Sequence, residues 1–209
     1  MERERITISI RKNVLDEVDR TIDGVAIRNR SHAIESLIKK GVGFSDNKSA
    51  VILLGGENAL LNIPVVKDIL TKLKKESFEK VFIAVGYLKT KIIESLGYGE
   101  DYDLEIIYSD KGEGTAGALL PIKGELGSTF IVFNVENKLD ISINNLMSFH
   151  KKHSLAATIV PDPVDTSKGV YIFKSSVFDY IPDGFSMLEE SVLPKLSREN
   201  ELAVFPSFQ

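Results

Sequence analysis

The chain has 209 residues, 43% of them hydrophobic and 27% charged, a composition ordinary for a globular protein. It contains no cysteine and three histidines, which excludes disulfide bonds, thiolate metal sites and a histidine-rich metal centre. The net charge of −4 is unevenly spread, because residues 1–45 carry nine Lys and Arg against seven Asp and Glu. No apolar run approaches the roughly 20 residues of a membrane span and the N-terminus lacks the apolar region of a signal peptide, so we expect a cytoplasmic location and no membrane partner.

Residues 5–10 alternate polar and apolar side chains with period two, which predicts a half-buried strand. Two helices are predicted after it, from about residue 14 to 22 with Asn13 as N-cap, and from about residue 31 to 40 with Ser31 at its start. One strand cannot complete its own hydrogen bonds, and so short a segment buries little core. The order therefore predicts a homodimer that pairs two such strands.

The pattern changes after a linker at residues 45–49. The predicted strands cover residues 51–54, 81–85, 104–108, 129–133, 156–160, 169–174 and 201–205. The predicted helices cover residues 65–75, 89–96, 143–152 and 187–196, and His150 and His153 are expected on a solvated helix end. This alternation predicts an α/β domain over residues 50–209, with a largely parallel sheet in a three-layer α/β/α arrangement.

The first segment, taken as a domain over residues 1–44, resembles the ribbon–helix–helix repressors. The similarity is carried by Arg-Ile-Thr-Ile-Ser-Ile (5–10), Val-Leu-Asp-Glu-Val-Asp (14–19) and Asn-Arg-Ser-His-Ala-Ile-Glu-Ser-Leu-Ile (29–38). It implies a β-α-α fold in which two chains intertwine and their strands enter the major groove of double-stranded DNA.

The residue chemistry of this segment is compatible with DNA contacts. The side chains expected at base edges are Arg5, Thr7 and Ser9, and those expected at the phosphate backbone are Arg11, Asn29, Arg30 and Ser31. The alternative is a dimerisation ribbon without DNA. An antitoxin is a further alternative, which a following folded domain of about 160 residues disfavours.

Residues 49–206 resemble the sugar-phosphate nucleotidyltransferases, which implies a Rossmann-like fold of the GT-A type. The matching stretches are Val-Ile-Leu-Leu-Gly-Gly (51–56), Asn-Ile-Pro-Val-Val-Lys-Asp-Ile-Leu (62–70), Val-Phe-Ile-Ala-Val-Gly-Tyr (81–87), Glu-Gly-Thr-Ala-Gly-Ala-Leu (113–119), Phe-Ile-Val-Phe-Asn (130–134), Gly-Val-Tyr-Ile-Phe-Lys (169–174) and Phe-Ser-Met-Leu-Glu-Glu-Ser-Val-Leu-Pro-Lys-Leu (185–196).

Two departures from that family bear on catalysis. The family's long Gly-rich loop is reduced to residues 57–61, and no Arg or Lys remains between Val51 and Val66. Asn134-Val135-Glu136 stands where the family has Asn-Gly-Asp before its metal site. Because nucleotidyl transfer develops negative charge on phosphoryl oxygens, these changes predict that catalysis is lost and that the chain has no catalytic residues, no metal site and no enzymatic activity.

Part of the family's binding site is expected to survive. The candidate ligand-binding residues are Gly55, Gly56, Gly114, Thr115, Ala116, Gly117 and Glu136. Glycines allow a ligand to approach the backbone, and the Thr115 hydroxyl can form a hydrogen bond with it. The alternative is that these glycines only shape turns and packing.

Together these features predict a homodimeric, DNA-binding transcriptional regulator without a cofactor. Its degenerate nucleotidyltransferase-like domain is expected to sense a small molecule, such as a nucleotide or nucleotide sugar, or to supply an oligomer interface. The main alternative is an active sugar-phosphate nucleotidyltransferase with a DNA-binding arm. That alternative needs a substitute for the missing cations, such as Lys67 or Lys111.

Overall fold

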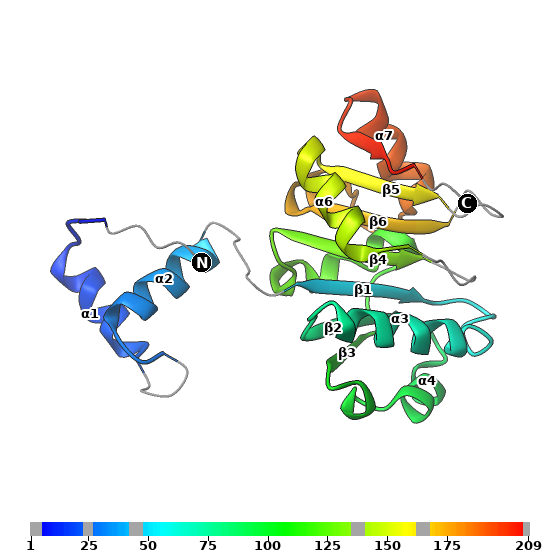
Figure 1. The fold of residues 1–209 in the computed structure, drawn as a ribbon, viewed down its shortest axis with the longest axis horizontal. Coiled ribbons are helices and arrows are strands. Elements are labelled where there is room, and N and C mark those ends of the chain that lie inside the picture. The colour runs from blue at the N-terminus through cyan, green and yellow to red at the C-terminus, as the bar shows by residue number, and fades with distance from the viewer. Residues whose placement is uncertain (1–5, 23–26, 42–47, 135–140, 162–167, 207–209) are drawn as a thin grey trace. The chain divides into compact units, whose positions relative to one another are not determined.

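A computed structural model describes residues 6–22, 27–41, 48–134, 141–161, 168–206 of the chain (Figure 1). The chain divides into two compact units, Met1–Phe44 and Ser45–Gln209. No helix within the described ranges combines the length and apolar character that a membrane span requires.

The smaller unit contains the two helices expected from the sequence, α1 (Lys12–Arg20) and α2 (Arg30–Gly41). Their ends differ from the prediction. Arg11, not Asn13, occupies the N-cap position of α1, and its side chain makes no capping hydrogen bond. At α2 the cap is Asn29, whose side-chain oxygen accepts a hydrogen bond from the His32 N–H at 3.0 Å. An Asn side chain satisfies this free donor as well as the predicted Ser31 would.

The predicted first strand is not formed in this single chain. Residues 6–10 have no regular secondary structure, and Ile6 and Ile8 are 67% and 50% exposed. A strand needs a neighbouring strand to satisfy its backbone hydrogen bonds, and the described part of the chain supplies none to this segment. The ribbon and its second chain therefore stay a prediction.

The larger unit is built on a mixed sheet of seven strands among the described residues. In chain order these are β1 (Ser49–Leu54), β2 (Lys80–Val85), β3 (Glu105–Ser109), β4 (Thr129–Asn134), β5 (Ala157–Pro161), β6 (Gly169–Lys174) and β7 (Leu202–Val204). Their order across the sheet is β3-β2-β1-β4-β6-β5-β7.

The expectation of a largely parallel sheet is confirmed for the described strands, since four of the six pairings are parallel, that of β5 with β7 among them. β1 pairs parallel with both β2 and β4, and β2 pairs parallel with β3. In contrast, β6 runs antiparallel to β4 and to β5. The connection between β5 and β6 spans only residues 162–168, too few for the crossover that a parallel pair requires, so the chain returns antiparallel.

Helices cover both faces of the sheet and give the predicted three layers. The longer ones are α3 (Ile63–Lys75), α4 (Lys89–Leu96) and α6 (Ile143–His153), which pack over one face against residues such as Ile52, Ile83 and Ile131. The other face is covered by α5 (Gly114–Gly117), by a π-helical turn over Leu188–Val192 and by α7 (Leu193–Arg198), together with 3₁₀ segments. The 3₁₀ segments on this face are Leu120–Glu125 and Ser175–Tyr180, whereas Glu100–Tyr102 packs with α3 on the first face.

The expectation that His150 lies on a solvated helix end is wrong. Ile143, Leu146 and His150 recur at helical spacing on α6 and all three are buried, with His150 only 3% exposed. The His150 ring nitrogen Nδ1 lies 2.9 Å from the Thr158 hydroxyl of β5. His153, three residues later, is exposed as predicted.

Candidate functional site

A hollow of about 290 Å³ lies where β1, β2, β3 and β4 end at their carboxyl edges. The strand order explains its position. The chain passes from β1 toward β2 on one side, whereas β4 lies on the other side of β1. Parallel α/β sheets bind ligands in the crevice that such a change of direction leaves at the carboxyl ends of the strands. The hollow is therefore the candidate functional site.

The predicted glycines have two different roles around this hollow. Gly55 and Gly56 line it, and a Cβ atom added to either would meet nothing within 4 Å, so their backbone is open to a ligand. Gly114 also lines it, but its φ is +78° and a Cβ there would lie 2.3 Å from the Ser186 carbonyl oxygen. Gly114 therefore serves close packing, as the alternative interpretation supposed.

Backbone hydrogen bonds connect the segment around Gly114 to Ser186. Ala116 N–H and Gly117 N–H both donate to the Ser186 carbonyl oxygen, at 2.9 and 3.2 Å. Ala116 and Gly117 are buried, whereas Thr115 lines the hollow. Of the predicted ligand residues, Gly55, Gly56, Gly114 and Thr115 are thus brought together at one site, and Glu136 lies outside the described residues.

A hydrogen-bond network centred on Glu189 borders the hollow, and the sequence analysis did not identify it. One Glu189 carboxyl oxygen accepts from Asn134 Nδ2 and from the Tyr171 hydroxyl, each at 2.9 Å. The other accepts from the Thr115 hydroxyl at 3.0 Å. Asn134 and Thr115 line the hollow themselves. The network thus holds one acidic side chain in a fixed orientation beside the candidate site.

This arrangement changes the role expected of Thr115. A hydroxyl has one proton to donate, and Thr115 donates it to Glu189 while accepting a hydrogen bond from the Leu188 N–H at 2.8 Å. The only sequence signal for the network was the acidic pair Glu189-Glu190 within the stretch that resembles the nucleotidyltransferases.

Two lysines lie near the end of β3. Lys111 lines the hollow and is exposed. Lys89, at the start of α4, forms an ion pair with Asp110, with 3.0 Å between Nζ and Oδ2. The Lys89 ammonium beside Asp110 holds the pKa of that carboxyl below its usual value. The acidic neighbour of Lys111 in the chain is therefore already paired with another lysine.

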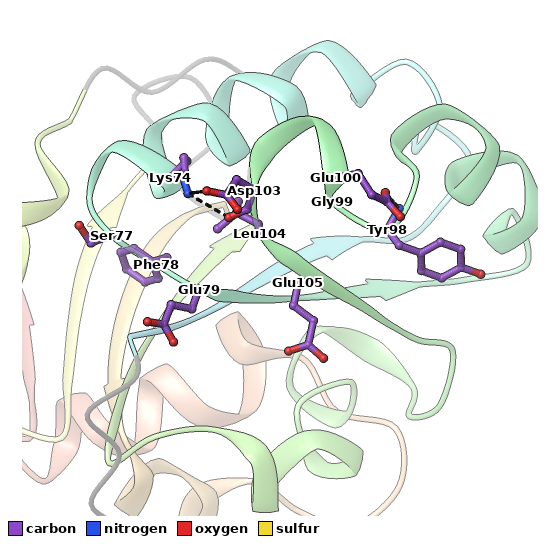
Figure 2. Close-up of a pocket in the computed structure, with 10 residues that line it drawn as sticks. All are labelled: Lys74, Ser77, Phe78, Glu79, Tyr98, Gly99, Glu100, Asp103, Leu104 and Glu105. Carbon is purple, nitrogen blue, oxygen red and sulfur yellow. Dashed lines mark hydrogen bonds and ion pairs between the residues drawn. The ribbon is translucent and has the colours of Figure 1, made fainter. Parts of the chain in front are cut away.

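A second hollow, of about 680 Å³, lies at the opposite, amino ends of β2 and β3 (Figure 2). Its wall carries four acidic residues, Glu79, Glu100, Asp103 and Glu105. In Figure 2 Lys74 points to Asp103, with which it forms an ion pair. The Glu100 carboxyl accepts a hydrogen bond from the Tyr98 N–H at 3.0 Å, so part of this acidic charge is engaged within the wall.

The residues predicted to contact DNA lie in the smaller unit. Thr7, Ser9, Arg11 and Ser31 are exposed, and Arg5 lies outside the described residues. Asn29 and Arg30 are engaged within the unit, Asn29 as the cap of α2. The Arg30 guanidinium donates to both carboxyl oxygens of Asp19, at 2.7 and 2.6 Å, which leaves fewer of its donors for a phosphate.

Comparison with known proteins relates the chain to one class of enzymes. No family profile matches it. It is 23% identical over 186 residues to a UTP–glucose-1-phosphate uridylyltransferase from Synechocystis, covering 66% of this chain and 48% of that protein. It is 27% identical over 140 residues to a probable glucose-1-phosphate cytidylyltransferase from Bacillus subtilis, covering 54% and 55%. A mannose-1-phosphate guanyltransferase from Aspergillus oryzae is 25% identical over 182 residues, covering 69% and 50%.

The chain thus spans about half the length of the curated relatives it matches. Among solved structures it resembles HddC from Yersinia pseudotuberculosis, with a TM-score of 0.56, 17% identity and coverage of 76% of this chain and 89% of that one. The same protein complexed with GMP-PN aligns with a TM-score of 0.57 at 16% identity over 77% of this chain and 90% of that one. At this level of identity the likeness concerns the fold.

The larger unit is nucleotidyltransferase-like. This overturns the prediction of a DNA-binding transcriptional regulator, because the similar proteins are nucleotidyltransferases and not regulators. The prediction that the chain is no enzyme is wrong for the same reason. That prediction was based on the absence of Arg and Lys from the short loop after β1. The composition of one loop does not show which other elements supply side chains to the site. The nucleotidyltransferase-like unit keeps an open hollow that a lysine from another loop lines.

Proposed function

We propose that the nucleotidyltransferase-like unit transfers a nucleotidyl group from a nucleoside triphosphate to a sugar 1-phosphate. An oxygen of the sugar phosphate forms a bond to the α-phosphorus of the triphosphate. The bond from that phosphorus to the oxygen bridging it to the β-phosphorus breaks, and diphosphate leaves with the electron pair. The products are a nucleoside diphosphate sugar and diphosphate.

The observation that carries this proposal is the hollow at the carboxyl ends of β1 to β4, in a unit whose relatives are sugar-phosphate nucleotidyltransferases. Gly55 and Gly56 follow β1 directly and have free space above their Cα atoms. A nucleotide can therefore lie against the backbone there. A volume of about 290 Å³ is near the lower end of ordinary ligand pockets, which suits the nucleoside part of the substrate.

Glu189 is proposed to bind the sugar. Three neutral donors orient its carboxyl group, which leaves acceptor capacity for a sugar hydroxyl, because an ionised carboxyl offers about four acceptor positions. Hydrogen bonds to charged groups are about twice as strong as neutral ones, so a carboxyl held in place distinguishes sugars by the position of their hydroxyls. The chemistry gives Glu189 a binding role.

A divalent metal ion commonly neutralises charge in nucleotidyl transfer. Within the ranges that the structure describes, no three His, Asp or Glu side chains are grouped to hold one. Glu136 is proposed as a ligand-binding residue and not as a metal ligand.

The test is an assay of diphosphate release with each of the four common ribonucleoside triphosphates and a panel of sugar 1-phosphates, including glucose and mannose 1-phosphate, in the presence of Mg²⁺. Mass spectrometry of the product identifies the nucleotide sugar. We expect release that requires both substrates, and Glu189→Ala is expected to raise the KM for the sugar phosphate more than that for the triphosphate. No nucleotide sugar with any pair of substrates would overturn the proposal.

For the smaller unit we propose a role in pairing two copies of the chain. Val18 and Ala33 are the hydrophobic residues buried in its described part, whereas Ile6 and Ile8 are exposed. A unit of this size rarely holds together without a partner, a metal or disulfides. Analytical ultracentrifugation of the full chain at micromolar concentration is expected to show a dimer. The double substitution Ile6→Asp, Ile8→Asp is expected to dissociate it. Val204→Asp, which places the same charge at an exposed position of β7, is the control and is expected to leave the dimer intact. A monomeric wild-type protein contradicts this role. The DNA contacts named from the sequence stay a prediction.

A further inference from the structure

The proposed transferase has to stabilise the charge of a triphosphate without cations from the loop after β1. Between Val51 and Val66 the chain has no Arg or Lys, although the backbone of this stretch forms one wall of the hollow. Phosphoryl oxygens carry the negative charge of the substrate, and positive groups beside them lower the free energy of both binding and transfer. A cation therefore has to reach the hollow from another element.

Among the described residues that line the hollow, Lys111 is the only one with a positively charged side chain. It belongs to the connection between β3 and α5, which also supplies Gly112 to the wall, and α5 follows directly with Gly114 and Thr115. The end of this connection is held in place because the Ser186 N–H donates to the Glu113 carbonyl oxygen at 3.1 Å, and the Ala116 N–H and Gly117 N–H of α5 donate to the Ser186 carbonyl oxygen. Lys111 thus projects from a fastened segment at the edge of the site.

The charges around Lys111 leave its ammonium available. Its neighbour Asp110 is paired with Lys89, and within the described part of the chain no hydrogen bond or ion pair involves the Lys111 side chain. Lys67, the other substitute considered from the sequence, lies on the exposed side of α3 and is not among the residues that line the hollow. The structure thereby distinguishes two lysines that the sequence left equivalent.

We infer that Lys111 binds a phosphate group of the nucleoside triphosphate and replaces the cations missing from the loop after β1. This inference rests on the proposed function, because it assigns a residue of the same site. The Lys111 ammonium donates charge-assisted hydrogen bonds to phosphate oxygens, and no covalent step is attributed to it.

Isothermal titration calorimetry of the full chain tests this role, with ATP, GTP, UTP and CTP each titrated in Mg²⁺ buffer. Lys111→Met removes the charge and keeps most of the length of the side chain, Lys111→Arg keeps the charge, and Lys67→Met makes the same change at a lysine outside the hollow. For the triphosphate that binds, Lys111→Met is expected to weaken affinity by about 10- to 100-fold, the range expected for loss of a hydrogen bond between charged groups. Lys111→Arg is expected to stay within a few-fold of wild type, and Lys67→Met to match it.

Ionic strength supplies a readout that a merely structural role would not move. Raising the KCl concentration screens a lysine–phosphate contact, so wild-type affinity is expected to fall more steeply with salt than that of Lys111→Met. If Lys111→Met and the wild type bind the triphosphate with equal affinity, or if their affinities depend equally on salt, the inference about Lys111 is wrong. Neither result contradicts the proposed transferase activity. If the wild-type protein binds none of the four triphosphates, both fail together.

Discussion

Acidification is expected to destabilise the larger unit through His150. This side chain lies on the buried face of α6 and is 3% exposed. Its Nδ1 lies 2.9 Å from the Thr158 hydroxyl, which is also buried. Burial, and next the positive charge of Lys174, lower the pKa of His150 to about 4, from an ordinary value of 6.5. The folded protein therefore resists protonation of a ring that protonates readily in the unfolded chain.

The magnitude follows from this difference in pKa. A group whose pKa is depressed by folding contributes its full stability above its unfolded value, and this contribution is lost as the pH falls from 6.5 toward 4. At about 1.4 kcal/mol for each pH unit, the whole loss is about 3 kcal/mol. Between pH 7 and pH 5 the unfolded chain takes up this proton while the folded protein does not, so about 2 kcal/mol of the loss is expected in this range.

Urea unfolding of the wild-type chain and of His150→Gln, followed by circular dichroism at pH 7, 6 and 5, measures this loss. Gln retains a hydrogen-bonding group for Thr158 but does not titrate, so its free energy of unfolding is expected to fall by about 2 kcal/mol less over the same range. A proton NMR titration that gave His150 a pKa above 6 in the folded protein would refute the argument, and so would parallel pH profiles of the two proteins.

Three further predictions concern the hollow and the hydrogen-bond network beside it. Gly114→Ala is expected to destabilise the larger unit by about 3 kcal/mol, because its φ is +78° and a Cβ there would lie 2.3 Å from the Ser186 carbonyl oxygen. Gly55→Ala is the control. A Cβ at Gly55 meets nothing within 4 Å, so the temperature at the midpoint of thermal unfolding should change little. Tyr171→Phe removes a hydroxyl that donates to Glu189 and is expected to cost about 1–3 kcal/mol in a urea titration; an unchanged midpoint would show that this bond contributes nothing. Glu189→Gln places an amide N–H group against the donors of Asn134, Tyr171 or Thr115. We expect at least a tenfold fall in kcat/KM for the sugar phosphate in the diphosphate-release assay. Unchanged kinetics would contradict a binding role for Glu189.

The regular elements were largely predictable because their signals are local. The apolar residues of β1, β2 and β4 form short uninterrupted runs, and the structure buries these strands on both faces. The helical spacing along α4 and α6 predicted their bounds to within a residue. The helix expected over residues 187–196 is instead a π-helical turn followed by α7, and Glu189 of this turn accepts hydrogen bonds from Asn134 of β4 and Tyr171 of β6.

The function was predicted less well than the fold. The sequence shows that the stretch after β1 lacks Arg and Lys, but the prediction that this absence abolishes catalysis is wrong, and so is the regulatory function inferred from the likeness of the smaller segment to DNA-binding repressors. The proteins similar to the chain are nucleotidyltransferases. The physical reason is that a site at the carboxyl end of a parallel sheet is lined by side chains from several loops, as Lys111 shows here. The residues of one loop therefore do not determine whether the site holds a positive charge.

Residue order alone determined the alternation of strands and helices, the glycines that follow β1 and the division of charge along the chain, since each depends on neighbouring residues. The tertiary structure alone decided that β6 runs antiparallel, that His150 is buried and that Glu189 meets Thr115 and Asn134, which lie 74 and 55 residues before it. Such contacts depend on the order and register of the strands in the sheet. No local periodicity specifies that order, because it results from the packing of the whole unit around two shared hydrophobic cores.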